Sequence, residues 1–130
     1  MNFVIGDFAE SVRTFSQADV EAFAQLSGDN NPVHLDESFA ASTVFKKRVV
    51  HGALVNSLFS KVLGTQFPGK GSIYLSQEST FKAPVYPGDE VKVRVELKDV
   101  KGKIGIFSTL CIGQGDKVLV EGTAKVRLPG

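Results

Sequence analysis

The chain has 130 residues, of which 42% are hydrophobic and 22% are charged, and its formal net charge is +1. This composition is that of a soluble globular protein, and the length predicts one domain, residues 1–130, with a single sizeable core. Lysines and arginines are scattered along the chain, so no basic tract points to nucleic acid. No uninterrupted apolar run approaches the length that crosses a membrane.

The N-terminal segment, MNFVIGDFAE, lacks the basic region and long apolar core of a signal peptide, so we expect a cytoplasmic protein. A short strand is predicted over residues 11–15. The single cysteine, Cys111, lies in an apolar run and has no partner for a disulfide within the chain. It is expected to be a buried, inert thiol.

The first predicted helix runs from Ser16 to Leu26. Ser16 is a candidate N-cap, and Asp19 follows three residues later as an acidic partner for the first turn. Gly28 is expected to end the helix in a left-handed conformation.

Asp29, Asn31, Pro32 and His34 follow at once, and the proline predicts a turn or an extended loop. A carboxylate and an imidazole five residues apart would then share one short, rigid loop. Such a pair can deprotonate a water molecule on one side and supply a proton on the other. The alternative is that Asp29 and Asn31 only cap the turn and that His34 is an ordinary, partly buried imidazole.

The second predicted helix spans residues 51–67, HGALVNSLFSKVLGTQF. Between Gly52 and Gly64 its only charged residue is Lys61, so we expect the helix to be buried on most of its surface. The backbone N–H groups at the start of a helix lack intrahelical partners. The N–H of Gly52 is therefore a candidate donor to an oxyanion, although the glycine could equally serve close packing.

The rest of the chain is predicted to be strand, over residues 72–83, 90–98, 104–112 and 117–128. The segment EVKVRVELK alternates valine or leucine with charged residues, the pattern of a strand with one buried face. Only the helix at residues 51–67 is apolar enough to cover the resulting antiparallel sheet. We therefore predict an α+β fold in which a curved, five-stranded sheet wraps around a central helix.

The stretch from Phe23 to Ala40, FAQLSGDNNPVHLDESFA, resembles the hydratase motif of the MaoC-like family, the (R)-specific enoyl-CoA hydratases. The segments VVHGALVNSLFSKVLG and GKGSIYLSQESTFKAPVYPGDEV also look like the central helix and following strands of that family. The likeness is closest to the small bacterial hydratases associated with polyhydroxyalkanoate synthesis. It implies a hotdog fold, a homodimer joined through sheet edges, an acyl-CoA thioester substrate, R products, and no metal or organic cofactor.

The resemblance implies that Asp29 is the general base, that His34 holds the same water and delivers a proton, and that the Gly52 N–H stabilises the thioester oxyanion. Asn31 either orients His34 or the water, or is only a turn residue. Ser60 either steadies Asp29 or lines the acyl pocket, or it bonds to its own helix. Phe59 and Leu63 are candidates for pocket walls or for simple core.

His51 is interpreted as structural. Two histidines and one cysteine in three separate segments do not form a metal-ligand set, so no metal site is predicted.

Two rival functions remain open at this point. Hotdog acyl-CoA thioesterases commonly carry a catalytic acid on or near the central helix, but residues 49–77 contain no Asp or Glu. A non-catalytic acyl-thioester-binding subunit would be expected to have lost the aspartate or the histidine, and this chain has both.

Overall fold

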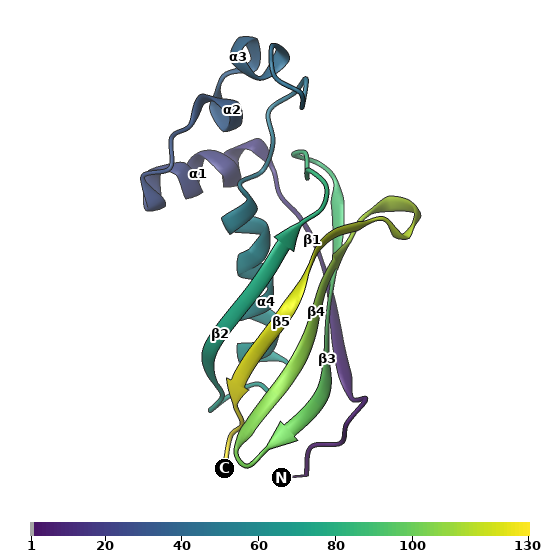
Figure 1. Cartoon of the computed structure of the whole chain (residues 1–130). Coiled ribbons are helices and arrows are strands. Elements are labelled where there is room, and N and C mark those ends of the chain that lie inside the picture. Colours follow the sequence, from purple (N-terminus) through teal and green to yellow (C-terminus); the bar gives the residue numbers. More distant parts are fainter. Residues whose placement is uncertain (1) are drawn as a thin grey trace.

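The computed structural model describes residues 2–130. A five-stranded antiparallel sheet curves around one long helix, and three shorter helices gather beyond one end of it (Figure 1). The elements in chain order are β1 (Phe8–Thr14), α1 (Gln17–Ser27), α2 (Pro32–Leu35), α3 (Glu37–Ala41), α4 (Gly52–Thr65), β2 (Ile73–Phe81), β3 (Glu90–Lys101), β4 (Ile104–Ile112), the 3-10 turn η1 (Gln114–Asp116) and β5 (Val118–Arg127). The predicted α+β arrangement of a sheet around a central helix is confirmed.

The order of strands across the sheet is β1-β3-β4-β5-β2. Strand β2 therefore pairs with the last strand of the chain, with Ser79 opposite Gly122, and β1 pairs with β3, with Ser11 opposite Val93. A Cβ atom on Gly122 would collide with the backbone carbonyl of Glu78. Glycine at this position lets β2 approach β5 closely enough to form the sheet edge.

The strand boundaries follow the sequence prediction with two extensions. Strand β4 coincides with its predicted range, Ile104–Ile112. Strand β1 starts earlier than predicted, at Phe8, and the N–H of Leu97 also donates to the carbonyl of Asp7 just before it. Strand β3 runs past its predicted end to Lys101, beyond a bulge next to Leu97. The hairpin to β4 holds this added stretch in the sheet.

The core lies between α4 and the concave face of the sheet. Alternate side chains of β3 point into it, as the pattern EVKVRVELK predicts: Val91, Val93, Val95 and Leu97 are all buried. Helix α4 faces them with Val55, Leu58, Phe59, Val62 and Leu63. Burying one such side chain contributes about 1.5–3 kcal/mol, so the apolar face of α4 is what closes the sheet around it.

The opposite side of α4 corrects one expectation. The helix was predicted to be buried on most of its surface, but Ala53, Ser57, Ser60 and Gly64 are exposed on the single chain. These small side chains lie on the face turned away from the sheet. No helix among residues 2–130 is both long and apolar enough to span a lipid bilayer.

Candidate active site

Helix α1 ends where the candidate site begins. At its start, the Ser16 hydroxyl accepts from the N–H of Asp19 at 3.1 Å, and the Asp19 carboxylate accepts from the N–H of Ser16 at 2.9 Å. This is the predicted capping box, and the backbone hydrogen bond from Ser16 lowers the pKa of Asp19. Gly28 ends the helix with φ at 82°, and its N–H donates to the carbonyl of Ala24. The next residue is Asp29, so the end of α1 at Gly28 determines the position of the Asp29 carboxylate.

His34 lies in the short helix α2, which corrects the expectation that it shares one short, rigid loop with Asp29. Pro32 occupies the first turn of α2, where its fixed φ suits a helix and its missing N–H costs nothing. The Asn31 side-chain oxygen accepts from the N–H of Val33 at 3.1 Å and caps this helix. Of the two roles considered for Asn31, the structural one is therefore observed.

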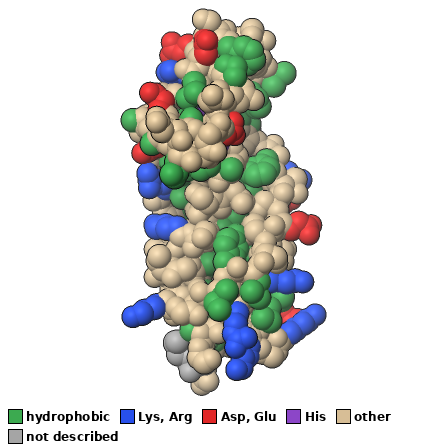
Figure 2. All heavy atoms as spheres, turned by 90° about the vertical axis from the view of Figure 1, so that its left-hand side faces the viewer, with side chains coloured by type: hydrophobic (Ala, Val, Ile, Leu, Met, Phe, Trp, Pro, Cys, Tyr) green, Lys and Arg blue, Asp and Glu red, His purple; other side chains and the backbone are tan. Residues whose placement is uncertain are grey.

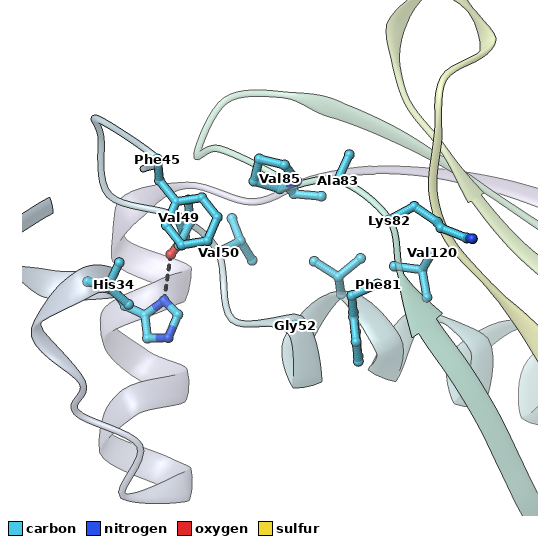
Figure 3. A pocket seen from close by; sticks show the side chains of 13 residues that line it. His34, Phe45, Val49, Val50, Gly52, Phe81, Lys82, Ala83, Val85 and Val120 are labelled. Carbon is cyan, nitrogen blue, oxygen red and sulfur yellow. Dashed lines mark hydrogen bonds between the residues drawn. The ribbon is translucent and has the colours of Figure 1, made fainter. Parts of the chain in front are cut away.

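The imidazole of His34 is anchored through one of its two nitrogens. Nδ1 lies 2.8 Å from the backbone carbonyl of Val49 (Figure 3). A carbonyl oxygen only accepts, so Nδ1 carries the proton and Nε2 is left for other partners. The backbone of the same residue is held as well, because the Gln17 side chain donates to the His34 carbonyl at 2.9 Å.

Asp29 lies beside this ring. Its side chain is exposed and accepts from the N–H of Asn31 at 3.4 Å. One ligand-type atom from each of Asp29, His34 and His51 lies within 4.8 Å of the other two. The predicted carboxylate–imidazole pair is therefore brought together, at a separation that a single water molecule bridges.

His51, the remaining member of this cluster, is buried, and its ring stacks on the ring of His34. The ring centroids of His34 and His51 are 3.8 Å apart and their planes are inclined by 26°. A metal ion lies in the plane of every imidazole that binds it, and two rings stacked in this way do not direct lone pairs at one point. The cluster therefore does not have the geometry of a shared metal site.

A cavity of about 320 Å³ opens next to His34 (Figure 3). Its walls are mostly apolar, and it is lined by Val33, His34, Phe45, Val49, Val50, Gly52, Val55, Phe81, Lys82, Ala83, Pro84, Val85 and Val120. These residues come from α2, the segment leading into α4, the start of α4, the end of β2, the segment that follows β2 (residues 82–85) and β5. An apolar cavity with one imidazole at its edge suits a substrate that has an apolar chain and a reactive polar group.

Gly52 is the first residue of α4, and it lines the cavity together with His34. The first N–H groups of a helix have no intrahelical acceptor, and the side chain of the preceding residue does not cap this helix. In Figure 3 the start of α4 faces the side chain of Phe81, on the side of the cavity opposite His34. A polar group entering the cavity can therefore reach both a backbone donor and the imidazole.

The three other residues assigned to the pocket from the sequence are not part of this cavity. Phe59 and Leu63 are buried in the core beneath the sheet, and Ser60 is exposed on the outer face of α4. The core interpretation, which was the alternative for Phe59 and Leu63, describes their positions. Ser60 is exposed on the single chain and does not line this cavity, so its place in the site stays a prediction.

Sequence reasoning missed Val49 and Phe81, which shape the site, and it interpreted His51 only as structural. The carbonyl of Val49 orients His34, the ring of Phe81 faces Gly52, and the buried ring of His51 supports His34 from behind. The dipeptide His51–Gly52 at the start of the apolar helix was the only signal that pointed toward them. The others are apolar or backbone groups whose role depends on the fold.

Comparisons with known proteins place the chain in one family. The profile of the family described as "MaoC like domain" matches residues 7–119. The (R)-specific enoyl-CoA hydratase of Aeromonas caviae is 48% identical over 96% of this chain and 95% of its own length. That of Rhodospirillum rubrum is 44% identical over 95% of this chain and 87% of its own. A solved structure described as an (R)-hydratase from A. caviae involved in PHA biosynthesis superposes with a TM-score of 0.94, at 47% identity and 98% coverage of both chains.

Proposed function

The chain belongs to the MaoC-like domain family, and we propose that it is an (R)-specific enoyl-CoA hydratase that adds water reversibly to trans-2-enoyl-CoA. One observation carries the catalytic assignment. The Asp29 carboxylate and the His34 imidazole lie within 4.8 Å of each other, so one water molecule can bridge them. His34 also lines the same apolar cavity as the uncapped N-terminus of α4. Hydration needs these three groups: a base, a proton donor and an oxyanion donor.

In the proposed mechanism the water molecule sits between Asp29 and His34. The carboxylate takes a proton from the water as the water oxygen bonds to the β-carbon. Asp29 passes this proton to Nε2 of His34, and Nε2 delivers it to the α-carbon, which restores both groups. Because Nδ1 is committed to the Val49 carbonyl, Nε2 is the nitrogen available for this transfer. Both groups act from one face of the double bond, so the addition is syn.

The N–H of Gly52 stabilises the developing negative charge on the thioester oxygen by donating a hydrogen bond to it. A donor of this kind contributes about 2.7–4 kcal/mol in comparable sites. Glycine has no side chain to keep the carbonyl at a distance, and the helix dipole of α4 adds positive potential at the same point. The reaction so described uses only water, two side chains and a backbone donor, and this supports the proposal that it requires no metal or organic cofactor.

The rival activity, acyl-CoA hydrolysis, has less support. Helix α4 reads GALVNSLFSKVLGT and contains no carboxylate that could act from the centre of the fold. A binding subunit without catalysis is also disfavoured, because both Asp29 and His34 are held in defined positions by hydrogen bonds to the backbone.

We also propose that two chains form a homodimer through the edge strand β2. Among residues 2–130 this strand pairs only with β5, and it exposes apolar side chains on a face that also includes the outer side of α4. Figure 2 looks toward this side of the molecule and shows hydrophobic side chains gathered along its middle. The exposed apolar residues of β2 are Ile73, Tyr74, Leu75 and Phe81. Pairing of two such edges would remove free hydrogen-bonding groups and apolar surface together.

The proposed product, an (R)-3-hydroxyacyl-CoA, is the kind of monomer that a polyester synthase consumes. The A. caviae structure is described as involved in PHA biosynthesis. We propose the same connection here, from intermediates of fatty-acid oxidation to polyhydroxyalkanoate precursors, in the cytoplasm.

The test of the proposed function is the loss of enoyl-thioester absorbance when the pure protein is mixed with crotonyl-CoA. An R-specific coupling enzyme reads the configuration of the product. Rapid loss with R product is the expected result. Release of free coenzyme A thiol would instead identify a thioesterase, and the absence of any reaction with short and medium chains would leave a binding function.

A further inference from the structure

We infer that His51 is a positioning residue for this reaction, whose ring holds Asp29 and His34 in register with the start of α4. The inference rests on the proposed function and extends it to a side chain outside the three reacting groups. His51 immediately precedes Gly52, it is 1% exposed, and it contacts both members of the carboxylate–imidazole pair.

The first contact is a hydrogen bond to the backbone of Asp29. Nε2 of His51 lies 2.9 Å from the Asp29 carbonyl oxygen, across a sequence separation of 22 residues. The other polar contacts of Asp29 come from its own loop, where its N–H donates to the Ser27 hydroxyl at 3.1 Å and its carboxylate accepts from Asn31 at 3.4 Å. The bond from His51 is thus the one that connects this loop to α4.

The second contact is the stack on His34, with centroids 3.8 Å apart. On its other side, His51 meets the ring of Phe23 from α1 edge to face, at 4.8 Å and 62°. The imidazole of His51 is therefore clamped between α1 and α2. Any rotation of it would disturb both the Asp29 backbone and the plane of His34.

The hydrogen bonds also assign the tautomer of each ring. A carbonyl accepts from Nε2 of His51, so the proton of that ring is on Nε2. Its Nδ1 is buried and has no hydrogen-bond partner among residues 2–130. A second proton there would be a buried donor without an acceptor, which is costly.

Two substitutions separate the hydrogen bond from the ring. His51→Gln keeps an N–H donor that can reach the Asp29 carbonyl but removes the aromatic ring, whereas His51→Phe keeps a stacking ring but has no donor. Displacement of a reacting group by about 1 Å costs up to about 100-fold in rate. We expect His51→Phe to lose this much in kcat with KM within about twofold of wild type. His51→Gln loses only the stack, and its kcat should stay within about threefold of wild type, because the hydrogen bond to Asp29 carries most of the positioning.

Val62→Ala is the matched control, because Val62 is fully buried in the same helix but does not line the cavity. It should lower the melting temperature while leaving kcat unchanged. Full kcat in His51→Phe would overturn the inference, and so would a loss in His51→Gln equal to that in His51→Phe.

A second measurement does not depend on the variants folding. Long-range 1H–15N spectra of the wild-type protein distinguish the two imidazole tautomers. We expect the proton on Nε2 for His51 and on Nδ1 for His34. A proton on Nδ1 of His51 would overturn the inference even if the enzyme is active. If the wild-type protein does not hydrate enoyl-CoA, the proposed function fails while the tautomers still report on His51.

Discussion

The ring of Phe81 at the end of β2 lies against Gly52 at the start of α4, so closely that a Cβ atom added to Gly52 would be 3.0 Å from Cε1 of Phe81. Both residues line the cavity. The glycine therefore has two effects at once: it makes room for the aromatic wall of the cavity, and it leaves the N–H of the first helical residue accessible.

Gly52→Ala should consequently reduce kcat/KM by about 10²-fold, because the new methyl group either displaces Phe81 or keeps the thioester carbonyl from the N–H. Gly64→Ala in the same helix is its control, since a Cβ there meets nothing within 4 Å. That substitution should raise the free energy of unfolding by about 0.4–1 kcal/mol and leave activity unchanged. Steady-state kinetics and chemical denaturation measure the two effects. Normal activity in Gly52→Ala would contradict the assignment of the Gly52 N–H as the oxyanion donor.

Asp29→Asn should lower kcat by about 10²–10⁴-fold, the usual contribution of a general base, while the free energy of unfolding changes by less than about 0.5 kcal/mol. The carboxylate is exposed and makes one long hydrogen bond, so little stability depends on it. His34→Ala should be equally inactive and lose about 1 kcal/mol of stability with its bond to Val49.

The control for both is Glu37→Gln, which changes an exposed acid on the neighbouring helix α3 that pairs with Arg48 at 3.0 Å. It should retain full activity, because an exposed ion pair contributes little. Substantial hydration by Asp29→Asn or His34→Ala would contradict the assigned roles.

Val55→Ala should extend the range of accepted acyl chains. Val55 is buried in α4 and lines the cavity, so removing two methyl groups deepens it. One methylene of chain length corresponds to about 1–3 kcal/mol, and we expect the ratio of kcat/KM for longer over shorter substrates to rise about tenfold. Val62→Ala deletes the same atoms from the core outside the cavity, and it should leave this ratio where it was. A series of enoyl-CoA lengths measures it.

Leu75→Glu should shift the proposed dimer to monomer. Leu75 is an exposed apolar residue of edge strand β2, and a pair of carboxylates at a shared edge would repel each other and resist burial. Val12→Glu makes the same change on the opposite edge strand, β1, at 54% exposure, and should leave the assembly intact. Light scattering coupled to size exclusion gives both masses. An unchanged mass for Leu75→Glu, or a monomer from Val12→Glu, would rule out the β2 interface.

Cys111 should be unreactive in the native protein. Burial raises the pKa of its thiol to about 12 from an ordinary value of 9.0, so almost no thiolate forms near neutral pH. Because the folded-state pKa lies above the unfolded value, the unfolded chain loses this proton first. The corresponding stability is complete below pH 9 and is lost as the pH rises toward about 12. Thiol labelling with and without denaturant tests this, and rapid labelling of folded protein would contradict it.

Much of the architecture could be predicted because local rules decide it. The capping box at Ser16 and Asp19, the glycine that ends α1, and the alternation along β3 depend only on neighbouring residues and on periodicity. The pairing of Asp29 with His34 belongs to the same class, since the two residues are five positions apart and a short connection leaves them little freedom. Here the sequence by itself determined the fold class and the closeness of Asp29 to His34.

The tertiary structure decided what depends on distant segments. The place of β2 beside β5, the contact of Phe81 with Gly52, and the burial of His51 between Phe23 and His34 join residues that no periodicity relates. The lining of the cavity depends on distant segments for the same reason. Helical spacing places Phe59, Ser60 and Leu63 on one helix with Gly52, but only packing against the sheet shows that two enter the core and one faces outward. Side-chain chemistry can be read along a chain, whereas the environment of each side chain is set by the surfaces that fold against it.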